Sequence, residues 1–433
     1  MKVKITKLLI FLIVIFFTSF YLNSQTVKTY SKIYVINVDG IINSIMASYI
    51  VNHIEKIERE GDGIIILRID TPGGLLESMR EIVLKIMNTK VPVIGYVSPE
   101  GARAASAGAF IILACDVVAM SPTSNIGAAH PVNLGQKIDR VMEEKIVNDT
   151  VAFITGIAKK RNKNQKIAKL MVTKSISITA QQAVKKNIAN FIANNIEELK
   201  SKLENYRIKK NGKSFLIHIK NAIVQYIKMN IMEKFLFKIS HPNIAYILLL
   251  LGIYGIMAEF SSPGIGFPGV VGSISLILAF FALNTLPINL AGLILIALSI
   301  ILFVLELKIQ SGGILGVGAA VSFILGSVML MRTSSKFLQI SPYIIVSAAI
   351  FTTGLFIILL MFGMKAQFYK AKTGKEAIIG EIGYAKTDVK PEGEVLVAGE
   401  RWQAVSFKNQ QINKGAKIQV VDIKNLRLIV KKI

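Results

Sequence analysis

Gly101 to His130 reads GARAASAGAFIILACDVVAMSPTSNIGAAH, with one serine, Ser106, set among small residues. Alanine and glycine around a serine allow close backbone approach, and the apolar run Ala109 to Ala114 predicts a buried helix that begins just after it. The first N–H groups of a helix lack partners within the helix and lie at the positive end of its dipole. They can stabilise the oxyanion that forms when a serine attacks a carbonyl, so we predict that Ser106 is a nucleophile. The alternative is that Ala-Ser-Ala-Gly serves only tight helix packing.

Alternating apolar runs and amphipathic stretches surround this segment. Ile33 to Val38 and Ile64 to Ile69 are typical of buried strands, and Ser44 to Glu60 is amphipathic with a helical period. The pattern then continues as helix, strand, the Ser106 helix and strand, with the other elements expected at 75–88, 91–97 and 117–120. This rhythm predicts an α/β domain with a parallel sheet and crossover helices over residues 30–205.

Two loops of this domain carry the parts of an acyl-transfer site. Asp70 to Gly74 reads DTPGG and follows a buried strand, as the Ser106 loop follows the next strand. The carboxyl ends of parallel strands meet at one edge of a sheet. We therefore expect the N–H groups of Ala107 and of Gly73 or Gly74 to form an oxyanion hole beside the Ser106 hydroxyl.

Four motifs carry a resemblance to a known family: DTPGG at 70–74, AASAGAF at 104–110, SNIGAAHP at 124–131 and TAQQA at 179–183. In order and spacing they resemble the caseinolytic-protease (ClpP)/crotonase fold. Within it they look like the long form of the NfeD (nodulation formation efficiency protein D) family of membrane-bound serine proteases. The resemblance implies a Ser-Lys dyad of Ser106 and Lys145 and cleavage of apolar peptide segments. It also implies a stomatin- or prohibitin-like membrane protein as partner and a homo-oligomer.

The general base stays open between two residues. A lysine titrates near pH 10, so Lys145 must be desolvated to accept a proton, and its neighbours Glu143, Glu144 and Asp149 should point to solvent. His130 needs no such shift and resembles the triad histidine of the soluble caseinolytic proteases in position. The four histidines are scattered and form no His-Glu-x-x-His motif, which argues against a metalloprotease; no cofactor is expected.

The N-terminus predicts export. Three lysines precede an apolar run from Leu8 to Leu22, and small polar residues follow. Residues 1–24 are therefore a signal peptide cleaved near Ser24 or an uncleaved N-terminal anchor. Both alternatives place the α/β domain outside the cytoplasm.

The middle of the chain predicts a transmembrane domain over residues 241–365. Five apolar segments suit four or five spans, at 244–257, 270–283, 290–305, 314–331 and 343–364. Five crossings from outside place Lys365 and the following lysines in the cytoplasm, as the positive-inside rule prefers. Glu259 and Glu306 should lie at the membrane interface. Residues 206–240, with apolar residues at near-helical spacing from Ile223 to Phe235, are expected to be a basic amphipathic linker at the membrane interface.

Residues 373–433 predict a second, all-β domain. Short strand-like runs separated by glycines have the size of a small closed barrel, and their spacing resembles the soluble OB-fold domain of the same family, with Trp402 in the core. The chain carries a net charge of +24 but has no arginine-rich block, and the barrel has few aromatics. We expect it to bind protein and not nucleic acid. The buried-looking Cys115 is expected to be a core residue.

Together these features predict a multi-pass cell-membrane serine endopeptidase, with the protease domain extracytoplasmic and the OB-fold domain cytoplasmic. It would act through an acyl-enzyme on apolar segments of stomatin-like membrane proteins. The alternative is a non-proteolytic membrane scaffold that binds stomatin-like proteins and organises membrane domains.

Overall fold

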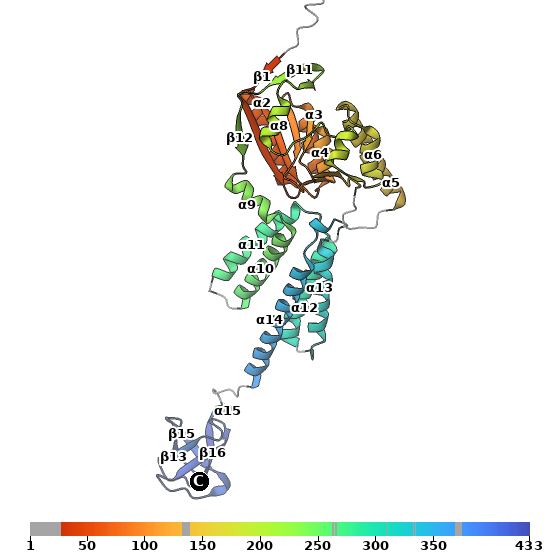
Figure 1. Ribbon diagram of the computed structural model, residues 1–433. Coiled ribbons are helices and arrows are strands. Elements are labelled where there is room, and N and C mark those ends of the chain that lie inside the picture. The colour runs from red at the N-terminus through yellow and green to blue at the C-terminus, as the bar shows by residue number, and fades with distance from the viewer. Residues whose placement is uncertain are drawn as a thin grey trace, which may run out of the picture. The chain divides into compact units, whose positions relative to one another are not determined.

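The computed structural model describes residues 27–131, 139–261, 264, 266–309, 311–331, 333, 335–368 and 375–433 (Figure 1). The predicted export signal lies outside these residues. The chain divides into two compact units, one running to Leu298 and including Val321–Ser347, the other formed by Ser299–Ala320 and Ala348–Ile433. The first unit contains the α/β domain and part of the apolar helices, and the second contains the barrel.

A six-stranded parallel sheet forms the centre of the α/β domain. Its order is β12-β2-β3-β4-β6-β9, with bounds Ile223–Ile227, Lys32–Asp39, Ile64–Asp70, Val93–Val97, Val117–Met120 and Phe191–Ile192. Buried apolar side chains alternate between two cores on its faces. One core includes the helices α2 (Ser44–Glu60), α3 (Leu76–Asn88) and α4 (Ala107–Ala114). The predicted order of strands and helices is confirmed.

A smaller sheet lies beside the first and carries the serine motif. It contains β5 (Arg103–Ala105), β7 (Asn125–Gly127) and β8 (Ser177–Thr179) in that order. The helices α5 (Arg140–Lys160), α6 (Gln165–Thr173) and α7 (Ala180–Lys185) follow the motifs along the chain. Thr179 and Gln182, both in the TAQQA motif, form a capping box at the start of α7.

The segment between the α/β domain and the membrane helices differs from the prediction. Residues 206–240 are more than a linker, because they form β10 (Arg207–Lys210), β11 (Lys213–His218) and β12 before a helix, α9 (Ile231–Ile239). The near-helical spacing from Ile223 onward therefore does not give one helix. β12 pairs in parallel with β2, and β11 pairs in parallel with β1 (Val27–Thr29). Further back in the chain, β9 separates α7 from α8 (Ile196–Leu203).

The five predicted apolar segments are all helical: α10 (Pro242–Ser261), α11 (Phe267–Asn284), α12 (Leu290–Ile309), α13 (Ile314–Leu330) and α14 (Pro342–Phe368) (Figure 1). Among the described residues, four of these helices are long and apolar enough to cross a membrane, and α13, with 17 residues, is shorter.

Glu259 and Glu306 have matching places in two helical hairpins. The Glu259 carboxylate accepts hydrogen bonds from the N–H groups of Gly266 (3.2 Å) and Gly269 (3.3 Å) at the start of α11. The Glu306 carboxylate accepts from Gly313 (3.0 Å) and Gly316 (3.2 Å) at the start of α13. Both sets of glycines follow their glutamate at positions +7 and +10. Each carboxylate thus satisfies N–H groups at the next helix's N-terminus, where negative charge is favourable.

The C-terminal domain is a closed barrel, as predicted. Its order is β13-β14-β15-β17-β16, with bounds Ile382–Ala385, Glu392–Val397, Glu400–Ser406, Arg427–Lys432 and Lys417–Lys424. Its core consists of small and branched apolar side chains such as Val395, Ile418 and Leu428. Trp402 is only partly buried and packs at the margin of this core, so its placement in the core was wrong.

Candidate active site

Ser106 lies at the junction between β5 and α4, as its sequence context predicts. Its backbone has φ +50° and ψ −114°, a conformation that residues other than glycine seldom adopt, and α4 begins at the next residue. The Ser106 N–H donates to the carbonyl of Gly127 on β7 at 3.0 Å. The side chain is half-buried and therefore within reach of a ligand. The strained turn presents a serine hydroxyl at the start of a buried helix.

Thr71 holds the DTPGG loop against the serine strand. Its backbone N–H donates to the Arg103 carbonyl (2.8 Å), and its carbonyl accepts from the Ala105 N–H (3.1 Å). The buried hydroxyl donates to the Gly40 carbonyl at 2.6 Å and accepts from the Gly73 N–H at 3.1 Å. Thr71 therefore fixes the distance between the two loops that carry the candidate site. Thr71 lies within the DTPGG motif, but the sequence pattern did not predict this role.

Gly73 and Ser106 are in direct contact. A Cβ on Gly73 would lie 2.7 Å from the Ser106 Cβ and 3.1 Å from its Oγ, and the Gly73 φ of +124° favours glycine. Gly108 is packed as closely, because a Cβ there would lie 2.5 Å from Thr71 Cγ2. The small residues of the two motifs thus permit the close approach that the sequence suggested.

The proposed oxyanion donors lie around this contact. Ala107 is the first residue of α4, so its N–H belongs to the helix's unpaired first turn. Gly73 donates its N–H to the Thr71 hydroxyl in this structure, and its carbonyl accepts from the Ile42 N–H at 2.9 Å. Gly74 forms a parallel bridge with Ile42. The glycine turn is therefore held from both sides, next to Ser106.

His130 lies after β7 and is turned toward α6. Its Nδ1 is 2.8 Å from the Val172 carbonyl, and because a carbonyl only accepts, Nδ1 carries the proton of this hydrogen bond. A neutral ring then leaves Nε2 as an acceptor. The ring is half-buried, and it makes no hydrogen bond with the Ser106 hydroxyl in the described part of the chain.

Lys145 lies in the second turn of α5, and its side chain is exposed. The desolvation that a lysine base needs is therefore not present in the single chain, contrary to our expectation. Within the described residues, no hydrogen bond joins Lys145 to Ser106. Its acidic neighbours have other partners, since Asp149 pairs with Arg80 of α3 and Glu144 pairs with Arg140, all at the surface.

One side chain near the serine comes from a distant part of the sequence. A Cβ on Gly73 would lie 3.3 Å from Cζ of Phe337, a residue of the short helix η1 (Lys336–Leu338) between α13 and α14. Nothing in the local pattern around Phe337 marks it as part of a site. Only the folded chain brings it next to the glycine turn.

An α/β domain built on a parallel sheet, apolar helices of membrane-spanning length and a small closed β-barrel define the class of this chain as a multi-domain membrane protein. Family models match its parts in succession: NfeD1b N-terminal domain over residues 32–214, NfeD integral membrane domain over 243–362, and NfeD-like C-terminal, partner-binding domain over 375–432. The chain belongs to the NfeD family, which confirms the resemblance read from its motifs.

Relatives span nearly the whole chain. It is 35% identical over 413 residues to the membrane-bound protease PH1510 of Pyrococcus horikoshii, covering 92% of each chain. It is 27% identical over 445 residues to the membrane protein NfeD1b of Bacillus subtilis, covering 95% of each. Among solved structures, the 1510-N membrane protease specific for a stomatin homolog from Pyrococcus horikoshii matches at 31% identity and a TM-score of 0.43. That match covers 48% of this chain and 98% of the solved one.

Proposed function

We propose that this protein is a membrane-bound serine endopeptidase that cleaves apolar peptide segments of a stomatin-like membrane protein through an acyl-enzyme. The observation that carries the proposal is the contact between Ser106, at the head of α4, and the glycine turn at Gly73. This contact puts a hydroxyl nucleophile beside two sets of backbone N–H groups, which is the arrangement that acyl transfer requires. The relationship to the membrane-bound protease PH1510 supports the same reaction.

In the proposed reaction, the Ser106 hydroxyl attacks the scissile carbonyl and its proton passes to the Nζ of Lys145. The N–H groups of Ala107 and of Gly73 or Gly74 stabilise the oxyanion. Collapse of the tetrahedral intermediate returns the proton to the leaving amine and leaves an ester on Ser106, which water then hydrolyses. Because Lys145 is exposed in the single chain, α5 must close over the bound substrate or against another subunit of a homo-oligomer to desolvate the amine.

We further propose that the protease domain and the barrel lie on opposite sides of the membrane. The Ser341 N–H, before α14, donates to Asn243 Oδ1, at the start of α10, at 2.8 Å. The Asn289 N–H, before α12, donates to the Leu330 carbonyl, at the end of α13, at 2.8 Å. These hydrogen bonds bring helix ends together and support an arrangement in which α10 and α11 cross and return as one pair, and α12 and α13 as another. α13 then also spans, although its 17 residues cover only about 25 Å.

With α14 as the fifth crossing, residues 375–433 reach the side opposite the protease domain. The export signal predicted from the sequence supports a protease domain outside the cytoplasm and a barrel inside it. We propose that this barrel binds the stomatin-like partner, because residues 375–432 match a partner-binding domain model and the relative's 1510-N protease is described as specific for a stomatin homolog.

Cleavage by the full-length protein in lipid nanodiscs tests the enzyme proposal. We expect a serine-reactive fluorophosphonate to label Ser106, and cleavage of an apolar peptide to be lost together with the label in Ser106→Ala. Unchanged cleavage in that variant would reject Ser106 as the nucleophile. A chain that binds its partner but neither labels nor cleaves supports the scaffold alternative.

The base is tested by comparing Lys145→Ala with His130→Ala. We expect the lysine variant to lose about 10²–10⁴-fold in kcat, the usual contribution of a positioned base, and the histidine variant to keep activity. Full activity of Lys145→Ala together with loss in His130→Ala would assign the base to the histidine.

A further inference from the structure

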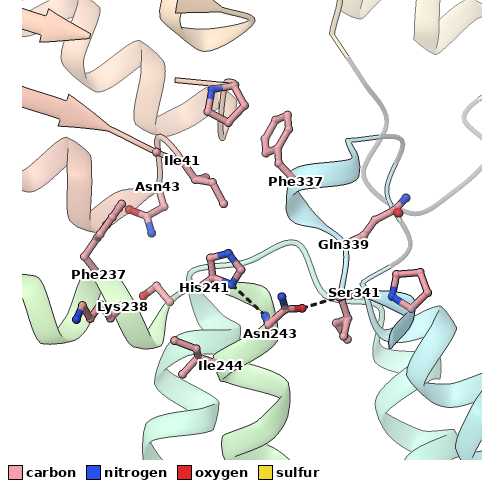
Figure 2. A pocket seen from close by; sticks show the side chains of 15 residues that line it. Ile41, Asn43, Phe237, Lys238, His241, Asn243, Ile244, Phe337, Gln339 and Ser341 are labelled. Carbon is pink, nitrogen blue, oxygen red and sulfur yellow. Dashed lines mark hydrogen bonds between the residues drawn. The ribbon is translucent and has the colours of Figure 1, made fainter. Parts of the chain in front are cut away.

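A large cavity adjoins the candidate site. Its volume is about 820 Å³, and all of its lining residues belong to the first compact unit. The α/β domain contributes Ile41 and Pro72, the latter directly before Gly73. The α9–α10 junction contributes Phe237 and His241, and the segment after α13 contributes Phe337 (Figure 2). The cavity is therefore formed jointly by the α/β domain and by segments next to the membrane helices.

Phe337 links this cavity to the nucleophile. A Cβ on Gly73 would lie 3.3 Å from the Phe337 Cζ and 3.1 Å from the Ser106 Oγ, so both side chains approach the same side of the glycine. The Phe337 ring therefore lies close to Ser106, where it can contact a peptide bound at the serine. Figure 2 shows the ring projecting from η1 toward the cavity that Ile41 enters from another side.

The segment that carries Phe337 is held in place. Its neighbours Leu338 and Ile340 are 1% and 4% exposed, whereas Phe337 itself is half-buried. The Leu338 N–H donates to the Ser335 carbonyl at 2.9 Å, and the Ser341 N–H donates to Asn243 at the start of α10. The buried side chains of Leu338 and Ile340, together with these hydrogen bonds, hold the Phe337 ring in place as one wall of the cavity.

The chemistry of the lining favours an apolar occupant. Ile41, Pro72, Phe237 and Phe337 supply apolar surface, and a cavity of this size can bury one large side chain or several smaller ones. His241 accepts the Asn243 N–H through Nδ1 at 3.3 Å, and burial lowers its pKa, which keeps the ring neutral. The charged lining residue Lys238 has an exposed side chain. A charged substrate side chain would find no buried counter-charge among these lining residues.

We propose that this cavity is a substrate subsite for a bulky apolar side chain next to the scissile bond, and that Phe337 is a specificity-determining residue of the protease. The inference rests on the proposed function and adds to it the residues that select the substrate. It also means that the loop between the last two membrane helices completes the site, so the α/β domain by itself would lack this wall.

The test uses the full-length protein in nanodiscs and a set of peptides that differ at one position beside the cleaved bond, carrying Ala, Leu, Phe or Trp. Removing the ring in Phe337→Ala should raise kcat/KM for the Trp peptide relative to the Leu peptide by about tenfold, the scale on which apolar pockets discriminate. Filling the cavity in Ile41→Trp should lower kcat/KM for the Trp peptide relative to the Leu peptide. Phe260→Ala removes an aromatic that is 81% exposed on α10 and should leave the profile unchanged.

Fluorophosphonate labelling of Ser106 distinguishes failure of the proposed subsite from failure of the proposed enzyme function. If both cavity variants label normally but keep the wild-type peptide profile, the subsite is wrong while the enzyme proposal stands. If Phe337→Ala raises kcat/KM equally for every peptide, the ring covers the site without selecting, and the specificity role is rejected. If the wild-type protein neither labels nor cleaves, the proposed function fails and the subsite with it.

Discussion

At the scale of single residues, the site depends on a contact that allows no side chain. In Gly73→Ala the new methyl group would overlap the Ser106 Cβ, at 2.7 Å, in addition to straining the backbone at φ +124°. We expect fluorophosphonate labelling and kcat to fall at least 10²-fold, because displacing a nucleophile by about 1 Å has that effect. The measurement is the rate of labelling in folded, full-length protein.

Gly61→Ala is the matched control for this prediction. Gly61 also has a positive φ, +76°, but its Cβ would meet nothing within 4 Å. It should lose some stability and keep the labelling rate. Equal labelling of both variants would show that the Gly73–Ser106 contact does not matter for the nucleophile.

The Thr71 hydroxyl holds the glycine turn in place. Thr71→Val keeps the shape but removes the hydroxyl that bonds to Gly40 and Gly73, so the glycine turn loses its fixed position. We expect kcat to drop about tenfold to a hundredfold with little change in KM, because in the proposed mechanism the turn supplies oxyanion donors. Thr71→Ser, which restores the hydroxyl, should recover most of kcat. A Val variant with wild-type kcat would limit Thr71 to packing.

At this scale the sequence predicted that Ser106 and the glycine turn lie together, but not the contacts that hold them there. Ser106 and Gly73 lie in local motifs that follow neighbouring strands. Because the carboxyl ends of parallel strands meet at one edge of a sheet, such motifs are expected to lie together. The role of Thr71 depends on the Gly40 carbonyl, which follows a different strand. The burial of Lys145 was a requirement of the mechanism and not a property of the sequence, and the side chain is exposed.

At the scale of elements, a buried ionic cluster joins strands and helices at the sheet edge opposite the site. The Asp116 carboxylate, fully buried before β6, pairs with Lys210 of β10 at 2.7 Å and with Arg161 after α5. It also accepts the Val93 N–H at 2.9 Å. The cluster thus ties β4, β6, β10 and the end of α5 together.

Asp116→Asn should destabilise the protein strongly, because two buried cations would lose their counter-charge. We expect a loss of about 3–5 kcal/mol in the free energy of unfolding, seen as a lower Tm in detergent. Asp149→Asn breaks the exposed pair with Arg80 and should cost at most about 1 kcal/mol. Similar Tm values for the two variants would contradict the structural role of the cluster.

The strand β12 was misplaced because its sequence pattern is ambiguous. In residues 223–235 the apolar side chains suit a helical period, yet Ile223–Ile227 pairs with β2 and extends the sheet. A short apolar run is ambiguous between strand and helix, and the unpaired edge of β2 decided the outcome. The long apolar helices were predicted correctly because their length leaves no such ambiguity.

At the scale of the whole molecule, membrane topology can be tested by cysteine labelling. Among single-cysteine reporters, Lys213→Cys in β11 should react with an impermeant maleimide in intact cells. Lys308→Cys at the end of α12 and Lys414→Cys in the barrel should react only after permeabilisation. The native Cys115 gives little background, since it is fully buried and burial raises its pKa to about 12. Labelling of Lys308→Cys in intact cells would contradict five crossings.

The sequence by itself determined the succession of an α/β domain, five apolar helices and a β-barrel, together with the serine and glycine motifs. These features are local: they follow from the period of apolar residues, from turn residues and from where strands end. The tertiary structure alone decided the Thr71 hydroxyl's partners, the Asp116 cluster and the position of Phe337 beside Gly73. Such contacts join segments far apart in the chain and depend on distances of a few ångströms, which no local pattern encodes.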